Sequence, residues 1–189
     1  MLSRIRQSRA WYKLGLIYLD LGYMLLNTFI NHIPAWRLRC LLYKMAGLKM
    51  GKKCRIGYGT VILRPHNITL GEGCIINEFC YLDGRGGITI EDNSSISVFS
   101  RLISASHDLQ SEDFAYTDHP IFIHDHVFIG AGATILEGSE LESGCAVGAG
   151  AVAKGHLEAN TIYYGNPLIK GRKRDITNSY QLYHEAYFR

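Results

Sequence analysis

A repeat of six residues dominates the segment 123–153, and it limits the folds that are open to this chain. Each hexapeptide begins with an aliphatic residue and has a small or β-branched residue in its fifth place. The first places are Ile123, Ile129, Ile135, Leu141 and Val147, and the fifth places are Val127, Ala133, Ser139, Cys145 and Ala151. A period of six matches neither a helix nor a simple strand. It fits a short strand and a turn, repeated, and stacked repeats of this kind form a parallel β-helix.

The same repeat extends toward the N-terminus, from about residue 48 to Leu102. Two of its steps contain two extra residues each, in the turn-like sequences RPHN (64–67) and DGRGG (83–87). The period then fails over residues 104–120 before it resumes at Ile123. A long segment without a repeat inside a regular array is usually functional, so we expect the loop 104–120 to carry chemistry.

The composition argues against several classes of protein. The chain has 189 residues, of which 47% are hydrophobic and 20% are charged, as in a globular domain with short appendages. A net charge of only +3 argues against a nucleic-acid partner. None of the five cysteines forms a CxxC pair, and Cys74, Cys80 and Cys145 fall on small fifth places, so we expect core residues and not a metal or disulfide framework. A reducing, cytoplasmic compartment is the corresponding expectation.

The N-terminal region is apolar over residues 14–30, but it does not predict a membrane span, because a charge, Asp20, lies in its middle. At helical spacing its polar residues form one narrow stripe, made of Lys13, Asp20, Asn27 and Asn31. Two compatible interpretations follow. Residues 11–30 form an amphipathic helix on a membrane surface, peripheral at the inner face of the cell membrane, or the helix packs on the solenoid or at a subunit contact.

The other flanking segments also predict helices. Residues 35–46 predict a second short amphipathic helix with a basic side made of Arg37, Arg39 and Lys44. The last residues, 175–189, predict a short helix with a tyrosine face. We therefore expect a mainly β protein with three parts: an N-terminal helical region (1–47), a β-helix domain (48–172) and a C-terminal tail (173–189).

Three features carry a resemblance to a known family: the hexapeptide array with one long loop after SASHD, the segment HVFIGAGATIL, and the closing YYGNP. Over residues 48–172 the chain resembles the hexapeptide-repeat acyltransferases, and among them the galactoside, maltose and polysaccharide O-acetyltransferases. The resemblance implies a left-handed parallel β-helix. It also implies a homotrimer with active sites between neighbouring solenoids, and acetyl-CoA as the acyl donor.

The resemblance also implies roles for individual residues. His107, at the start of the long loop, matches the general base, and Asn77 matches an asparagine that places the acceptor sugar. Asp83 lies near an acceptor-side carboxylate, with a spacing that differs by one. Ala131 matches a residue whose backbone N–H faces the thioester oxygen, and Phe128 lies where the family often has a tryptophan beside the cofactor. Four further residues match cofactor-lining positions: Ala149, Ala153, Lys154 and Arg172.

The residue types suit acyl transfer to a hydroxyl. A hydroxyl becomes a good nucleophile when a base removes its proton, and a histidine titrates in the right range. A fixed N–H donor, such as the turn Gly130-Ala131-Gly132 offers, can stabilise the tetrahedral intermediate. We expect direct attack within a ternary complex, because the cysteines are assigned to the core.

Two alternatives remain open from the sequence. His119, His124 and His126 have spacings that resemble the zinc ligands of the γ-type carbonic anhydrases, which are also hexapeptide solenoids. A non-catalytic, membrane-docked scaffold is the other. For the acyltransferase, the leading acceptor is a sugar hydroxyl of a lipid-linked glycan precursor or a nucleotide sugar; serine, an aminoglycoside-like antibiotic and chloramphenicol are the other candidates.

Overall fold

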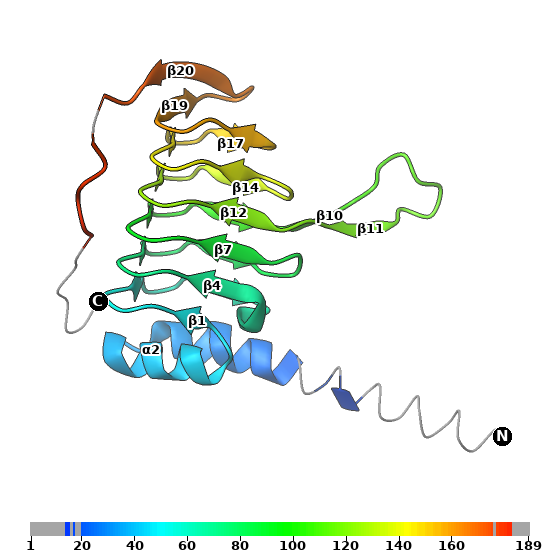
Figure 1. Cartoon of the computed structure of the whole chain (residues 1–189). Coiled ribbons are helices and arrows are strands. Elements are labelled where there is room, and N and C mark those ends of the chain that lie inside the picture. The colour runs from blue at the N-terminus through cyan, green and yellow to red at the C-terminus, as the bar shows by residue number, and fades with distance from the viewer. Residues whose placement is uncertain (1–13, 16, 18–19, 176, 183–189) are drawn as a thin grey trace.

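The computed structural model describes residues 14–15, 17, 20–175 and 177–182, and it shows a parallel β-solenoid with helices at its N-terminal end (Figure 1). Each coil contributes one short strand to each of three sheets, here named A, B and C. In order along the solenoid, sheet A contains β1 (Lys49–Met50), β4 (Ile68–Leu70), β7 (Ile88–Ile90), β12 (Ile121–Ile123), β15 (Glu140–Leu141) and β18 (His156–Leu157). Sheet B contains β2 (Arg55–Ile56), β5 (Ile75–Ile76), β8 (Ser95–Ile96), β13 (Phe128–Ile129), β16 (Ala146–Val147), β19 (Thr161–Tyr164) and β20 (Ile169–Lys173), the last of which pairs antiparallel with β19. Sheet C contains β3 (Val61–Leu63), β6 (Tyr81–Asp83), β9 (Arg101–Ile103), β14 (Thr134–Leu136) and β17 (Val152–Ala153).

This architecture confirms the predicted β-helix, and it is consistent with left-handed coiling. The turns between strands lie where two sheets meet, and we name these edges the A–B, B–C and C–A corners. The strand register places each first-place residue directly above the one in the coil below: Leu82 pairs with Leu102, and Leu102 pairs with Ile135. All three side chains have no exposed surface. The six-residue repeat therefore corresponds to columns of stacked aliphatic side chains inside the solenoid.

The predicted core cysteines are buried within these columns. Cys74, Cys80 and Cys145 are at most 1% exposed. Burial raises the pKa of the Cys80 thiol and of the Cys145 thiol to about 12. Because a protonated thiol is a weak nucleophile, these two cysteines are unsuited to forming an acyl-enzyme.

The fourth place of most hexapeptides has a left-handed backbone, which the sequence analysis did not identify. Glycine or asparagine fills this place in many coils, as at Gly73 (φ 67°) and Asn93 (φ 54°), because these residues tolerate positive φ. On the B–C corner, two coils have phenylalanine there instead, Phe79 (φ 56°) and Phe99 (φ 62°). A bulky residue in this conformation is unusual and is often found where function requires it.

The N-terminal helices close the open end of the solenoid. Residues 20–24 are α-helical and are followed by the π-helical turn η1 (Leu25–Phe29), the 3₁₀ turn η2 (Ile30–His32) and α2 (Trp36–Met45), with a further 3₁₀ turn, η3 (Pro65–Asn67), between β3 and β4. The side-chain amide of Asn27 accepts from the N–H of Ile62 (2.7 Å) and donates to the carbonyl of Ile62 (2.9 Å), as a neighbouring strand would. The buried Arg39 side chain likewise donates to the carbonyl of Ile56 (3.0 Å).

These contacts match the interpretation in which the N-terminal helix packs on the solenoid. Asn27 and the buried Asn31 belong to the predicted polar stripe but face the solenoid, because the first coil has unpaired backbone groups that need partners. Arg39 does not lie on an exposed basic side for the same reason. The apolar side of the N-terminal helical segment faces outward, and its residues Leu21, Leu25 and Phe29 are more than half exposed. Lys13 and most of residues 11–19 lie outside the described residues. Within the described part of the chain, no helix combines the length and hydrophobicity that a bilayer crossing requires.

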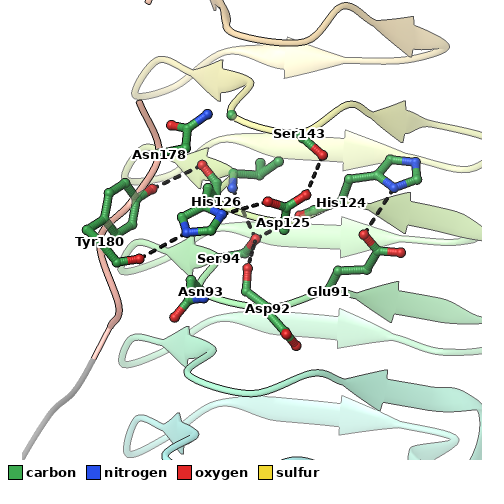
Figure 2. Close-up of polar contacts among 12 residues, drawn as sticks. Glu91, Asp92, Asn93, Ser94, His124, Asp125, His126, Ser143, Asn178 and Tyr180 are labelled. Carbon is green, nitrogen blue, oxygen red and sulfur yellow. Dashed lines mark hydrogen bonds and ion pairs between the residues drawn. The ribbon is translucent and has the colours of Figure 1, made fainter. Parts of the chain in front are cut away.

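The C-terminal segment returns along the A–B corner in an extended conformation (Figure 1). Arg174 donates to the carbonyls of Gly144 (2.6 Å) and His126 (3.1 Å). The Tyr180 hydroxyl donates to the carbonyl of His126 (3.0 Å), and Nε2 of His126 contacts the carbonyl of Tyr180 (2.9 Å; Figure 2). The expected C-terminal helix is therefore absent from residues 177–182, because their polar groups bond to the turns of the solenoid; residues 183–189 lie outside the described range.

Candidate active site

Three interruptions of the hexapeptide repeat stack at one edge of the solenoid. Residues 64–67 connect β3 to β4, residues 84–87 connect β6 to β7, and residues 104–120 connect β9 to β12. All three connections run from sheet C to sheet A, so they lie one above another at the C–A corner. The longest one projects from the solenoid as a hairpin of β10 (Ala105–His107) and β11 (Tyr116–Asp118), which we call the arm (Figure 1).

A half-buried ion pair anchors the base of the arm. The Asp83 side chain has no exposed surface, and its two oxygens accept from Nε (2.9 and 3.1 Å) and Nη2 (2.7 Å) of Arg85. The Ser104 hydroxyl donates to the Asp83 carbonyl and accepts from the N–H of Gly86 (2.8 Å). Asp83, which the resemblance placed on the acceptor side, thus holds Arg85 in position, and its carboxylate is already occupied.

His107 lies on the arm, where Phe114 contacts one nitrogen and one face of its imidazole ring. Its Nδ1 is 2.8 Å from the carbonyl oxygen of Phe114, and its ring stacks on the Phe114 ring at a centroid distance of 4.2 Å. A carbonyl oxygen only accepts hydrogen bonds, so Nδ1 carries the proton of the neutral ring. The lone pair then lies on Nε2, which has no partner among the residues that the structure describes. This is the tautomer that a general base requires.

A cavity of about 450 Å³ lies between the arm and the two shorter connections. Tyr116 lines it and pairs with His107 across the hairpin, with the two rings 5.9 Å apart in an edge contact. The Arg85 guanidinium lies 5.9 Å from the Tyr116 ring, so the ion pair, the tyrosine and the histidine form one continuous contact series. The sequence analysis missed Arg85 and Tyr116; the insertion DGRGG was the available signal for the first.

The B–C corner holds a second group of predicted residues. Asn77 directly follows β5 and donates from its amide to the carbonyl of Ile96 (3.1 Å), while Ala131 and Ala149 are exposed in the turns after β13 and β16. The N–H of Ala131 has no acceptor in the described part of the chain. Phe79 and Phe99 stack at 5.5 Å beside Asn77 and are about half exposed. Their bulk at a place that glycine or asparagine fills in many other coils was the signal in the sequence.

The other predicted cofactor residues have varied surroundings. Phe128 is 43% exposed on sheet B, and Arg172 is exposed on β20. Lys154 lies at the C–A corner and its Nζ is 2.7 Å from the Glu137 carboxylate. Ala153 is fully buried in sheet C, so its methyl group belongs to the core, and only its backbone is available to a ligand. Exposed cations and small residues fit a ligand that carries phosphates.

One chain does not bring the two groups together. The arm leaves sheet C at the C–A corner, and Asn77, Ala131 and Ala149 lie at the B–C corner, the opposite edge of the same sheet. The candidate base and the candidate N–H donor therefore lie on different edges of the solenoid.

The three histidines of the zinc alternative do not converge. Nδ1 of His126 contacts the Asp125 carboxylate (2.6 Å) and its Nε2 faces Tyr180, whereas His124 points in another direction, toward Glu91 (3.2 Å; Figure 2). His124 also lies 3.2 Å from Glu140. His119 lies at the end of the arm, in the C–A connection. His124, Glu140 and Glu142 are near one another, but one histidine with two glutamates is not the predicted ligand set.

The solenoid and the arm define a hexapeptide-repeat transferase, and comparisons with known proteins identify the family. Residues 120–155 match the family model described as bacterial transferase hexapeptide (six repeats). The chain is 32% identical over 139 residues to the putative colanic acid biosynthesis acetyltransferase WcaF of Escherichia coli K12, covering 74% of this chain and 76% of that one. This chain belongs to the hexapeptide-repeat acetyltransferases, and it is an acyltransferase.

Solved structures confirm the fold. A hexapeptide-repeat acetyltransferase from Vibrio cholerae, in complex with acetyl coenzyme A, superposes with a TM-score of 0.77 at 24% identity over 86% of this chain and 90% of that one. A galactoside acetyltransferase in complex with coenzyme A superposes with a TM-score of 0.75 at 21% identity, over 92% and 89% of the two chains. Both structures share the fold of this chain over most of its length.

Proposed function

We propose that this protein transfers an acetyl group from acetyl-CoA to a hydroxyl of a sugar, with His107 as the general base. The observation that carries the proposal is the tether between Nδ1 of His107 and the Phe114 carbonyl, which leaves Nε2 as the proton acceptor. The likeness to WcaF, named for colanic acid biosynthesis, supports a polysaccharide or its precursor as the acceptor. The acetyl-CoA bound in the structural relative supports the donor.

The proposed reaction is a direct attack. Nε2 of His107 takes the proton of the sugar hydroxyl while the oxygen attacks the thioester carbonyl carbon. The N–H of Ala131 donates to the carbonyl oxygen as it becomes negative, and Asn77 orients the sugar. The tetrahedral intermediate then breaks its carbon–sulfur bond. The imidazolium of His107 returns its proton to the leaving thiolate, so that free CoA and the acetyl ester result and the enzyme is unchanged.

The separation of the two corners supports assembly of the site between copies of the chain. In the proposed homotrimer, the arm of one protomer brings His107 to the B–C corner of its neighbour, where Ala131 and Asn77 lie. Small exposed residues at that corner, Ala149 among them, would line the pantetheine, and Lys154 and Arg172 would meet the phosphates. The outward apolar residues Leu21, Leu25 and Phe29 support peripheral contact with a membrane.

The direct test is turnover of acetyl-CoA against a panel of sugars, nucleotide sugars and oligosaccharides, with thiol release and the acetylated product both measured. We expect stoichiometric thiol and acetyl ester with at least one sugar acceptor. Transfer only to an amino group would contradict the hydroxyl acceptor. No thiol release above the blank with any member of the panel, from a protein that binds acetyl-CoA, would contradict the proposed reaction.

A further inference from the structure

A second cavity, of about 700 Å³, adjoins the arm pocket and has a different character. It runs between the N-terminal helices and the first coils, and its lining is mainly apolar, with Leu25, Leu26, Ile30, Leu42 and Met45 among the contributing residues. Leu25 and Met45 are 53% and 74% exposed, so this groove opens to the surface of the described structure. We call it the apolar groove.

The apolar groove and the arm pocket share three lining residues, and all three are basic: Arg64, His66 and Arg85. Neither acidic lining residue is shared, since Asp20 lines only the apolar groove and Asp118 only the arm pocket. Arg85 is neutralised by Asp83, whereas the exposed guanidinium of Arg64 has no partner among the described residues. A positive junction therefore separates an apolar compartment from a polar one.

This order of surfaces matches one class of ligand. An apolar chain would lie in the groove, a phosphate would lie at the basic junction, and a sugar would extend into the pocket beside Tyr116, which pairs with His107. Arginine binds phosphate oxygens with paired hydrogen bonds, and apolar grooves of this size hold hydrocarbon chains. A free nucleotide sugar would leave the apolar groove empty.

We propose that the apolar groove binds the lipid chain of a lipid phosphate, and that the acceptor is a sugar carried on that phosphate. The proposal rests on the proposed function for the identity of the reaction, but the lipid site itself does not depend on catalysis. Arg64 is assigned to the phosphate and Leu25 to the chain. Neither residue belongs to the proposed catalytic machinery.

Binding of n-decyl phosphate, below its micelle concentration and without vesicles, tests the site by calorimetry. Inorganic phosphate provides the charge alone, and decyl glucoside provides the chain alone. We expect decyl phosphate to bind at least about a hundredfold more tightly than inorganic phosphate, because most of its area is apolar. We expect Arg64→Ala to weaken decyl phosphate about tenfold and to leave decyl glucoside unchanged, since one charge-assisted contact is lost.

Matched variants separate the groove from general effects. Leu25→Glu should weaken both decyl ligands about tenfold, whereas Leu41→Glu, at an exposed leucine outside the groove (56% exposed), should not. Arg37→Ala controls for the charge of Arg64→Ala. His107→Ala should bind decyl phosphate like the parent, so a failed reaction is distinguishable from a failed lipid site.

Three outcomes would overturn the proposal: no binding of decyl phosphate by the folded parent, equal affinity for inorganic phosphate, or equal losses with Arg37→Ala and Arg64→Ala. A groove that is covered by a second copy of the chain would give the first outcome, together with a change of oligomeric state in Leu25→Glu.

Discussion

The B–C and C–A corners of the solenoid differ in how much the length of their connections varies. At the B–C corner every turn has nearly the same length, and its backbone bonds to the turn of the next coil, as in Gly57 N–H to Ile76 carbonyl (2.7 Å) and Asn77 N–H to Ile96 carbonyl (2.9 Å). At the C–A corner the connections range from residues 154–155 to the arm at 104–120. The difference shows where this fold can vary. Hydrogen bonds between stacked turns fix the length of the B–C turns, whereas the C–A connections can lengthen and carry additional functional residues.

The two corners also complement each other chemically. The C–A corner offers a proton acceptor and a basic junction, and the B–C corner offers N–H groups, small residues and the strained phenylalanines Phe79 and Phe99. Substitutions at the two corners should therefore have different effects on activity and stability.

The largest effect is expected at the arm. His107→Ala should lower kcat by ~10²–10⁴, because a positioned acid–base group is lost. The melting temperature should not change, since the side chain is exposed and bonds only to a loop carbonyl. Initial rates and calorimetry of the purified variant measure both. His119→Ala, elsewhere in the same connection, is the control; an equal loss there would mean that the arm had been disturbed as a whole.

The B–C corner should respond in stability. A Cβ at Gly130 would lie 2.6 Å from the backbone nitrogen of Ala149, so Gly130→Ala should lower the free energy of unfolding by about 1–3 kcal/mol. Two glycines inserted near Glu112 in the arm should cost less than about 1 kcal/mol, because lengthening a loop is inexpensive. Urea unfolding compares the two. Equal costs would remove the distinction between the corners.

An intermediate effect is expected where the arm joins the solenoid. Asp83→Asn preserves shape but removes the charge that holds Arg85, and Arg85 can turn to solvent because it is 42% exposed. We expect a loss of about 1–2 kcal/mol in stability and a kcat reduced by less than tenfold, through a displaced Tyr116. Glu137→Gln, which breaks the Lys154 pair at the same corner, should leave kcat for a saturating acceptor unchanged.

The smallest effect is a pH dependence at the A–B corner. Burial lowers the pKa of His124, but hydrogen bonds to Glu140 and Glu91 outweigh burial and raise the pKa above its ordinary value. The stabilisation is therefore complete below about pH 6.5 and is lost as the pH rises through the folded-state pKa. The melting temperature should fall slightly between pH 6 and 8.5, and the fall should be smaller in His124→Gln. A fall of the same size in the variant would contradict the assignment.

The sequence predicted those features that repeat. Aliphatic first places and small fifth places specify the columns of the core, because each coil meets an identical coil. The stacking of residues 64–67, 84–87 and 104–120 could not be predicted from their separate positions without the three-strand coil. The partners of Asn27, Asn31 and Arg39 could not be predicted, because a helical pattern does not show which polar residues face open backbone groups.

The site was predictable only in part, for a related reason. His107 was proposed as the base because it lies where the repeat breaks and because it matches the general base of the family. Asp83 was assigned to the substrate, since sequence spacing cannot show that Arg85 occupies both of its oxygens. The apolar groove involves residues from four separate segments, so no local pattern reveals it.

In the proposed trimer the two corners of different protomers make one active site, and mixing inactive chains can test this arrangement. His107→Ala and Asn77→Ala protomers, each with little activity alone, are denatured together, refolded at equal amounts and assayed for acetyl transfer. In random trimers, about a quarter of the sites would combine an intact His107 with an intact Asn77 of the next protomer, so we expect up to about a quarter of parental activity. A mixture no more active than the mean of the separately refolded variants, with mixed trimers verified by mass spectrometry, would contradict the shared site.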